Sequence, residues 1–140
     1  MRATRSARKA RRIEVPVSEP QYKFWYSKAR FRALAGGRGS GKTFIGALDL
    51  LTRALEAEPG RLYAVYAPTY RMLEDASFRT LLLLGQQYQM ISQVNRSDLR
   101  VLLHNGSEIL GRSLEDPERV RGLNLSGAWI DEASLVDEEA

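Results

Sequence analysis

The sequence lacks cysteine altogether and contains a single histidine, His104. Without cysteine the chain can form neither a disulfide framework nor a thiolate metal site, and one histidine cannot form a histidine metal cluster. These absences exclude the metal sites that are built on cysteine or on several histidines. The absence of cysteine also agrees with a reducing cytoplasm.

Long apolar runs are absent as well. No run approaches the roughly 18 apolar residues of a membrane span, and no apolar stretch of a signal peptide follows the basic N-terminus. We therefore expect no membrane partner. With 140 residues, 44% of them hydrophobic, the chain is long enough for about one domain with a sizeable core.

Acidic residues are missing from the first twelve positions, although the net charge of the whole chain is only +4. The basic residues there are Arg2, Arg5, Arg8, Lys9, Arg11 and Arg12. Such an arm favours a nucleic acid or another anionic partner. The alternative is a disordered tail that only interacts with solvent. We predict a basic disordered arm over residues 1–16.

The remainder alternates between strand-like and helix-like segments. After a short helix that Pro20 opens, we expect strands at Phe31–Ala35, Leu62–Ala67 and Ala128–Ile130, and helices over Thr43–Glu56 and from Pro68 to about Gln87. Two further strand-like runs, Ile91–Arg96 and Leu99–His104, precede Asn105-Gly106, a dipeptide typical of a type I′ hairpin turn, and Ser107–Gly111 returns. This pattern predicts a three-layer α/β domain with a mostly parallel sheet and an antiparallel hairpin at one edge.

The first motif is a glycine-rich loop that matches the complete pattern G-x-x-x-x-G-K-[ST]. It consists of Gly36, Gly37, Arg38, Gly39, Ser40, Gly41, Lys42 and Thr43. Glycines let the backbone curl so that its N–H groups face a triphosphate, and the following helix adds its positive end. Lys42 is expected to reach the β- and γ-phosphates, and the Thr43 hydroxyl to ligate Mg²⁺. We predict a P-loop that binds ATP with Mg²⁺; the alternative is a glycine-rich loop without function.

The second motif is a pair of acids, Asp131 and Glu132, at the end of the apolar run Ala128-Trp129-Ile130. This is the form of a Walker B motif. Asp131 would hold Mg²⁺, and Glu132 would orient and deprotonate the attacking water. Acids often follow strands by chance, so it is the P-loop roughly ninety residues upstream that favours the functional interpretation.

With both motifs in place, the chain from about Pro20 onward resembles the N-terminal ATPase region of the large terminase subunit of tailed bacteriophages, a motor that packages DNA. The resemblance rests on the arginine inside the loop, on Arg121-Gly122 followed by residues 125–133, on Gln21 with Phe24 and Trp25, and on Ala67-Pro68-Thr69. The last segment is also similar to helicase-like ATPases.

The resemblance implies further roles. Gln21 would contact adenine and so select ATP, and Arg38 would lie near the phosphates. Arg121, eleven residues before Glu132, would act as an arginine finger across a subunit interface, with Arg119 and Arg112 as alternatives. A plain surface glutamine and a solvated loop arginine are the competing interpretations of Gln21 and Arg38.

The resemblance also implies partners: double-stranded DNA, a small terminase subunit, a portal, and further copies in a homo-oligomeric ring of the full-length protein, located in the host cell cytoplasm. Family members continue beyond Walker B with further strands and a nuclease domain, whereas this chain ends eight residues after Glu132. We therefore expect residues 17–140 to be a partial P-loop ATPase domain, in a fragment or a truncated gene product.

Three functions stay open at this point. The first is the ATPase module of a DNA-packaging motor, in which the full-length protein couples hydrolysis to translocation of double-stranded DNA. The second is a helicase-like nucleic-acid ATPase, and the third is a nucleotide-binding fragment without turnover. The loop arginine and Arg121-Gly122 favour the first.

Overall fold

Helix α2 (Lys42–Glu56) is the central element of the molecule. Apolar residues at three- and four-residue spacings form its buried stripe, and Ile45, Leu48, Leu51 and Leu55 are all buried. The helix begins within one residue of the predicted start and ends where predicted. Other elements pack on two of its sides, so the helix after the glycine-rich loop is fixed along its whole length.

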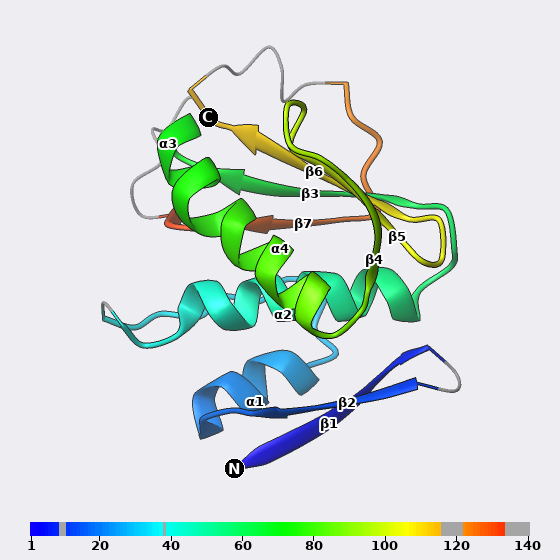
Figure 1. The fold of residues 1–140 in the computed structure, drawn as a ribbon. Coiled ribbons are helices and arrows are strands. Elements are labelled where there is room, and N and C mark those ends of the chain that lie inside the picture. Colours follow the sequence, from blue (N-terminus) through cyan, green and yellow to red (C-terminus); the bar gives the residue numbers. More distant parts are fainter. Residues whose placement is uncertain (9–10, 38, 116–121, 134–140) are drawn as a thin grey trace.

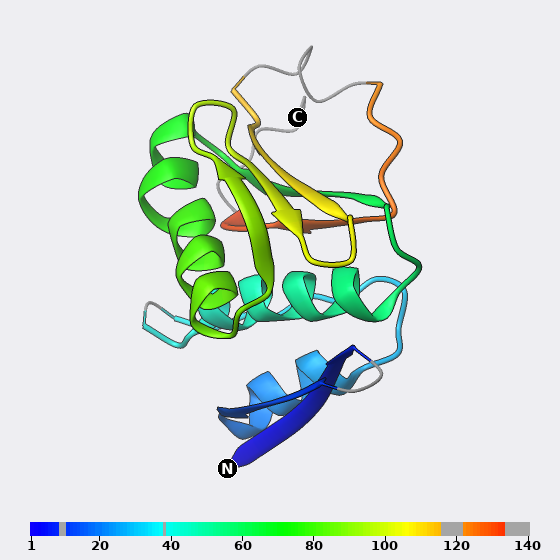
Figure 2. The ribbon, with the colours of Figure 1, turned by 45° about the vertical axis from the view of Figure 1, so that its right-hand side comes forward.

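The computed structural model describes residues 1–8, 11–37, 39–115 and 122–133. A five-stranded sheet lies above α2 in Figure 1, and an N-terminal hairpin with helix α1 (Glu19–Tyr26) lies below it. The turned view in Figure 2 shows the same stacking. Among the described residues, no helix has the length and apolar character needed to cross a membrane.

The sheet has a parallel centre and an antiparallel edge. Its order is β4-β5-β6-β3-β7, with β3 parallel to both β6 and β7. The strands are β3 (Leu62–Ala67), β4 (Ile91–Asn95), β5 (Arg100–Leu103), β6 (Glu108–Ser113) and β7 (Gly127–Ile130). The predicted strands from Leu62 to Ile130 are confirmed, and the chain does turn at Asn105-Gly106. The predicted type I′ turn is wrong, because only Gly106, with a φ of 83°, has a positive φ, whereas a type I′ turn needs one at both central residues.

Helices cover one face of this sheet. The segment after β3 consists of α3 (Tyr70–Met72), the π-helical turn η1 (Leu73–Ser77) and α4 (Phe78–Gln87). Val65, Gly111 and Trp129 are in register on adjacent strands and therefore share a face. Gly111 lies against the side chains of η1 and α4, and Trp129 lies against α2. Both helical segments consequently pack on the same face.

The predicted strand at Phe31–Ala35 is wrong, because these residues carry no strand pairing. Phe31 is 84% exposed, so the apolar run does not form a buried strand. A groove with a volume of about 560 Å³, lined by residues 31–36 and 128–133, separates this segment from β7. A strand needs a hydrogen-bonded neighbour, and none of the described strands lies in that position.

The N-terminal segment is folded, so the prediction of a disordered arm is wrong for residues 1–8 and 11–16. Strands β1 (Arg2–Arg8) and β2 (Arg11–Pro16) pair as an antiparallel hairpin. The reason is an alternation that the basic composition obscured: Ile13, Val15 and Val17 point to one side and are buried with Ala3 in the main core. The predicted boundary at residue 16 therefore does not separate two structural units.

Helix α1 joins this hairpin to the rest of the molecule. Ser18 and Gln21 form a capping box at its start. The indole Nε1 of Trp25, fully buried, donates to Thr52 Oγ1 on α2 at 2.9 Å. The hydroxyl of Tyr26 donates to the carbonyl of Thr4 on β1. These bonds hold the hairpin, α1 and α2 together as one packed layer.

We expect Gly46→Ala to lower the free energy of unfolding. A Cβ at this position of α2 would lie 2.3 Å from Nε1 of Trp129 on β7. Overpacking of this kind costs about 1–3 kcal/mol, from which the better helix propensity of alanine recovers up to roughly 1 kcal/mol. Urea unfolding followed by circular dichroism measures the difference.

The matched control for this prediction is the double variant Gly46→Ala/Trp129→Phe. The smaller ring leaves room for the methyl group, so the two substitutions should be less than additive. Full additivity, or a Gly46→Ala variant as stable as the parent, would contradict the close contact between α2 and β7.

Candidate functional site

The glycine-rich loop has a backbone shape that requires glycine at specific positions. Gly39 and Gly41 have φ values of 72° and 79°, in the left-handed region that glycine adopts without strain. A Cβ on Gly36 would lie 2.8 Å from Ser40 Oγ, and one on Gly41 would lie 2.3 Å from Gln21 Nε2. The loop therefore closes tightly on itself and ends directly at the first residue of α2.

Lys42 lies at the start of α2 and folds back over this loop. Its Nζ donates to the carbonyl oxygen of Gly36 at 2.5 Å. The N-terminal end of α2 carries main-chain N–H groups without helical partners, and these favour an anion. The ammonium group and the helix terminus thus direct positive charge into the same space.

The two sequence motifs meet at Asp131. The hydroxyl of Thr43 lies 3.1 Å from Oδ2 and 3.3 Å from Oδ1 of this carboxylate, although 88 residues separate the two in the sequence. The main-chain N–H of Asp131 donates to Tyr66 O on β3 at 2.9 Å, which fixes the backbone. The sheet therefore places Asp131, directly after β7, beside the residue that follows the glycine-rich loop's lysine. The Walker B role of Asp131 stays a prediction.

Sequence reasoning missed a third residue at this point, Ser77. Its hydroxyl donates to Oδ2 of Asp131 at 2.7 Å, and the residue is only 1% exposed. No motif marks it. The one available signal was its position four residues from both Leu73 and Leu81, which places it on the buried face of the helical segment.

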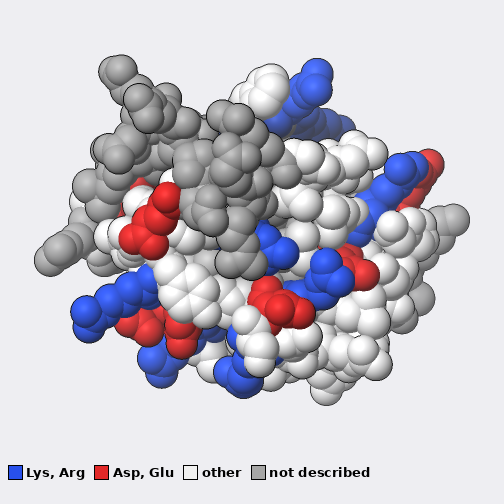
Figure 3. All heavy atoms as spheres, turned by 90° about the horizontal axis from the view of Figure 1, so that it is seen from above, with Lys and Arg blue, Asp and Glu red and all other residues white. Residues whose placement is uncertain are grey.

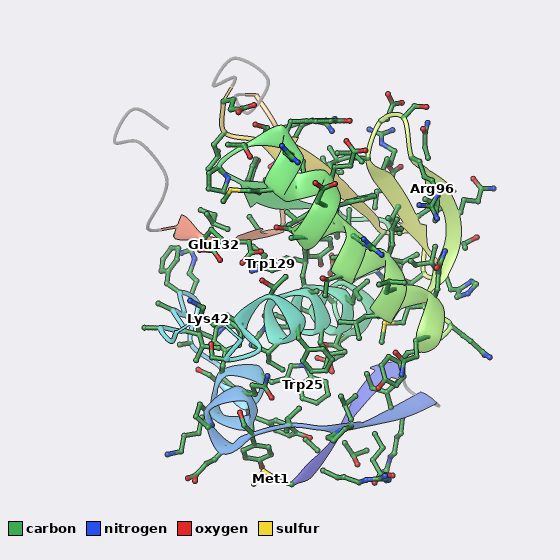
Figure 4. All side chains as sticks on the ribbon, turned by 60° about the vertical axis from the view of Figure 1, so that its left-hand side comes forward. Met1, Trp25, Lys42, Arg96, Trp129 and Glu132 are labelled. Carbon is green, nitrogen blue, oxygen red and sulfur yellow. The ribbon has the colours of Figure 1, made fainter. Side chains whose placement is uncertain are left out.

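Glu132 has a left-handed backbone conformation, with a φ of 53°, so the chain turns away from the direction of β7 at this residue. Its N–H donates to Oδ1 of Asp131 at 3.1 Å, and its side chain is exposed. Glu132, Lys42 and Thr43 line one cavity of about 520 Å³, and Figure 4 shows Glu132 above Lys42 at the end of β7. A non-glycine residue in this conformation costs about 1–3 kcal/mol and is common at functional sites.

Of the four arginines predicted to act at the site, the structure describes only Arg112. Arg38, Arg119 and Arg121 lie outside the described residues. Arg112 lies on β6, where it donates to the carbonyl oxygens of Asp98 and Gly111. It is not among the residues that line the cavity at the phosphate loop.

The side chain of Gln21 binds the backbone of the glycine-rich loop. Its Oε1 accepts from the N–H of Ser18 at 2.9 Å, and its Nε2 donates to the carbonyl of Gly41 at 3.1 Å. The side chain is largely buried, with 9% of the residue exposed. Both ends of the amide are therefore engaged within the protein, and the predicted contact with adenine stays a prediction.

The donor set at Asp131 suits Mg²⁺. Mg²⁺ keeps several waters and is held by one or two carboxylates together with substrate phosphates. One carboxylate and one hydroxyl, Asp131 and Thr43, lie side by side next to the loop. Among the described residues no group of three or more histidine, cysteine, aspartate or glutamate side chains forms a protein-only cage.

A glycine-rich loop that ends in a helix, and a carboxylate at the carboxyl end of a parallel strand beside it, define the nucleotide site of a P-loop α/β protein. Comparison with known proteins identifies the family. Residues 33–140 match the model of the family described as terminase large subunit, T4likevirus-type, N-terminal. The chain belongs to this family, as the sequence resemblance predicted.

Individual relatives agree with this assignment. The chain is 27% identical over 112 residues to the PBSX phage terminase large subunit of Bacillus subtilis (strain 168). This match covers 78% of this chain and 25% of that protein. It matches the large terminase ATPase domain of Thermus phage P74-26 with a TM-score of 0.71 and 26% identity, over 87% of this chain and 55% of that one.

A variant of the same Thermus phage domain supports the fold alone, with a TM-score of 0.68 and 24% identity over 87% of this chain and 56% of that one. The chain thus spans a quarter of the curated relative and about half of the solved domain. The predicted α/β P-loop fold class is confirmed.

We expect Gln21→Glu to weaken the binding of ATP and of GTP by the same factor. The substitution places a carboxylate oxygen against the Gly41 carbonyl, and loss of the hydrogen bond costs about 1–2 kcal/mol, a factor on the order of ten. Calorimetric titration with each nucleotide measures this. Lys23→Ala, on the exposed side of α1, is the control and should change neither affinity. A loss confined to ATP would instead show that Gln21 contacts adenine.

Proposed function

We propose that this chain forms the ATP site of a DNA-packaging motor, and that hydrolysis at this site drives translocation of double-stranded DNA in the full-length protein. The observation that carries the proposal is the contact between Thr43 and Asp131, 3.1 Å apart, beside a cavity that Lys42 and Glu132 also line. Membership of the terminase large-subunit family supports the coupling to DNA.

The loop and Lys42 would bind the triphosphate of ATP. Main-chain N–H groups of residues 39–43 and the N-terminal end of α2 would surround the phosphates, and the ammonium group would move from the Gly36 carbonyl onto the β- and γ-phosphate oxygens. A carbonyl is a weaker partner for an ammonium group than a phosphate oxygen, so this exchange favours binding.

Thr43 and Asp131 would hold Mg²⁺, which when bound neutralises part of the phosphate charge. Glu132 would accept the proton of the attacking water and orient it toward the γ-phosphate. The left-handed turn at Glu132 separates the two carboxylates, so that Asp131 stays buried at 6% exposure while Glu132 reaches the open cavity. The adjacent acids would therefore serve two different roles.

The partners in this proposal come from the family. Double-stranded DNA, a small terminase subunit, a portal and a ring of identical subunits in the host cell cytoplasm are those expected of a packaging motor. Arg121 is proposed to complete the site of a neighbouring subunit. On the face seen in Figure 3, basic and acidic side chains are mixed, and the described atoms there form no continuous basic patch.

We expect Glu132→Gln to keep ATP–Mg²⁺ binding and to lower turnover by about a hundredfold or more, because the amide cannot accept the proton of water. Lys42→Ala should instead abolish binding, because the phosphate charge loses its ammonium partner. Calorimetry and phosphate release in the full-length protein separate the two effects. Parental turnover in Glu132→Gln would assign the base to another residue.

The coupling to DNA is tested by ATP turnover of the full-length protein with double-stranded DNA, with single-stranded DNA, and without DNA. A packaging motor should be stimulated by double-stranded DNA at low salt and less at high salt, because its phosphate contacts are screened. Stimulation by single strands alone would favour the helicase-like function. Nucleotide binding without turnover under any of these conditions would favour a binding module.

A further inference from the structure

Ser77 makes the closest side-chain contact with Asp131 of those found within the described structure. Its Oγ lies 2.7 Å from Oδ2, whereas the Thr43 hydroxyl and the Glu132 N–H lie at 3.1 Å or more. Ser77 is 1% exposed and Asp131 is 6% exposed, so water does not compete for this bond. The serine belongs to neither the phosphate loop nor the Walker B strand.

A local irregularity of the helix places Ser77 there. The N–H of Phe78 donates to the carbonyl of Leu73, five residues earlier, which is the hydrogen bond of a π-turn rather than of an α-helix. Leu73 and Phe78 are the two residues that this hydrogen bond joins, and both are buried against Gly111 on β6. With both anchors fixed in the core, the extra residue of the turn directs Ser77 over the carboxyl end of β7. Such turns are rare in proteins, and many of those that do occur lie at functional sites.

The bond removes the remaining freedom of the carboxylate. The main chain of Asp131 is fixed by Tyr66 on β3, but this leaves its side chain free to rotate. Ser77 holds Oδ2 from the helix side, and the Glu132 N–H holds Oδ1. An ionised carboxylate has about four acceptor positions, so the lone pairs that face Thr43 are not used by Ser77 or by the Glu132 N–H and could bind a metal ion.

We propose that Ser77 is a positioning residue that orients Asp131 toward Mg²⁺. This inference rests on the proposed function, because it assumes that Asp131 and Thr43 hold the metal ion. Partners that fix a ligating carboxylate typically contribute a factor of 10–100 to metal affinity. The serine itself would touch neither the metal ion nor the nucleotide.

The test measures the Mg²⁺ dependence of nucleotide affinity in the full-length protein, with a fluorescent ATP analogue as the probe. We expect Ser77→Ala to raise the Mg²⁺ concentration at half-saturation by about tenfold and to leave the affinity measured in EDTA unchanged. Ser77→Cys keeps the shape of the side chain, with a somewhat larger atom at its end, but has only a weak donor, so it should behave like the alanine variant.

The matched control is Ser107→Ala. Ser107 is also fully buried, and its hydroxyl accepts from the N–H of Arg61 at 3.2 Å, at the start of β6 and so at the opposite end of that strand from the site. It should lower stability without changing the Mg²⁺ dependence.

Two outcomes overturn the positioning role: an unchanged Mg²⁺ dependence in both Ser77 variants, or failure of both to fold, which would make the serine a purely structural residue. A parent protein that binds no nucleotide, or binds it without regard to Mg²⁺, would overturn the proposed function instead.

Discussion

The site depends on the contact between Gly46 of α2 and Trp129 of β7. The absence of a side chain at Gly46 lets the indole lie directly on the helix backbone. Thr43 is one helical turn before Gly46, and Asp131 is two residues after Trp129, so each functional residue shares a face with its neighbour in this contact. The approach of helix to strand therefore sets the 3.1 Å separation of the hydroxyl and the carboxylate.

The other side of α2 fixes the chain that enters the glycine-rich loop. Arg32 forms two hydrogen bonds of 2.8 and 2.7 Å with the carboxylate of Asp49, which also accepts from Arg53 Nε at 2.9 Å. Paired and largely buried charges of this kind are sensitive to the loss of either partner. Because Arg32 lies four residues before the loop and Lys42 begins α2, both ends of the loop are attached to the same helix.

Much of the fold and both halves of the site could be predicted from the sequence, because the periodicity of α2 and the complete loop pattern are local signals. The pairing of β1 with β2 was missed, because the basic residues obscured the alternation of Ile13, Val15 and Val17. Phe31–Ala35 was assigned to a strand on composition alone, but pairing is a property of the neighbouring chain. The spacing of Ser77 from Leu73 and Leu81 indicates a buried position, but its contact with Asp131 could not be predicted, because the π-turn depends on packing at both of its ends.

The groove between residues 31–36 and 128–133 leaves one side of β7 without a strand partner within the described structure, and Ile130 at this edge is 52% exposed. An unpaired strand edge of this kind is a template for β-pairing, so among the described strands β7 is one at which a further strand could pair. A strand docked along the same edge would stiffen the end of β7 that carries Asp131 and Glu132. Pairing at this edge would therefore bear directly on how firmly the acidic pair is held.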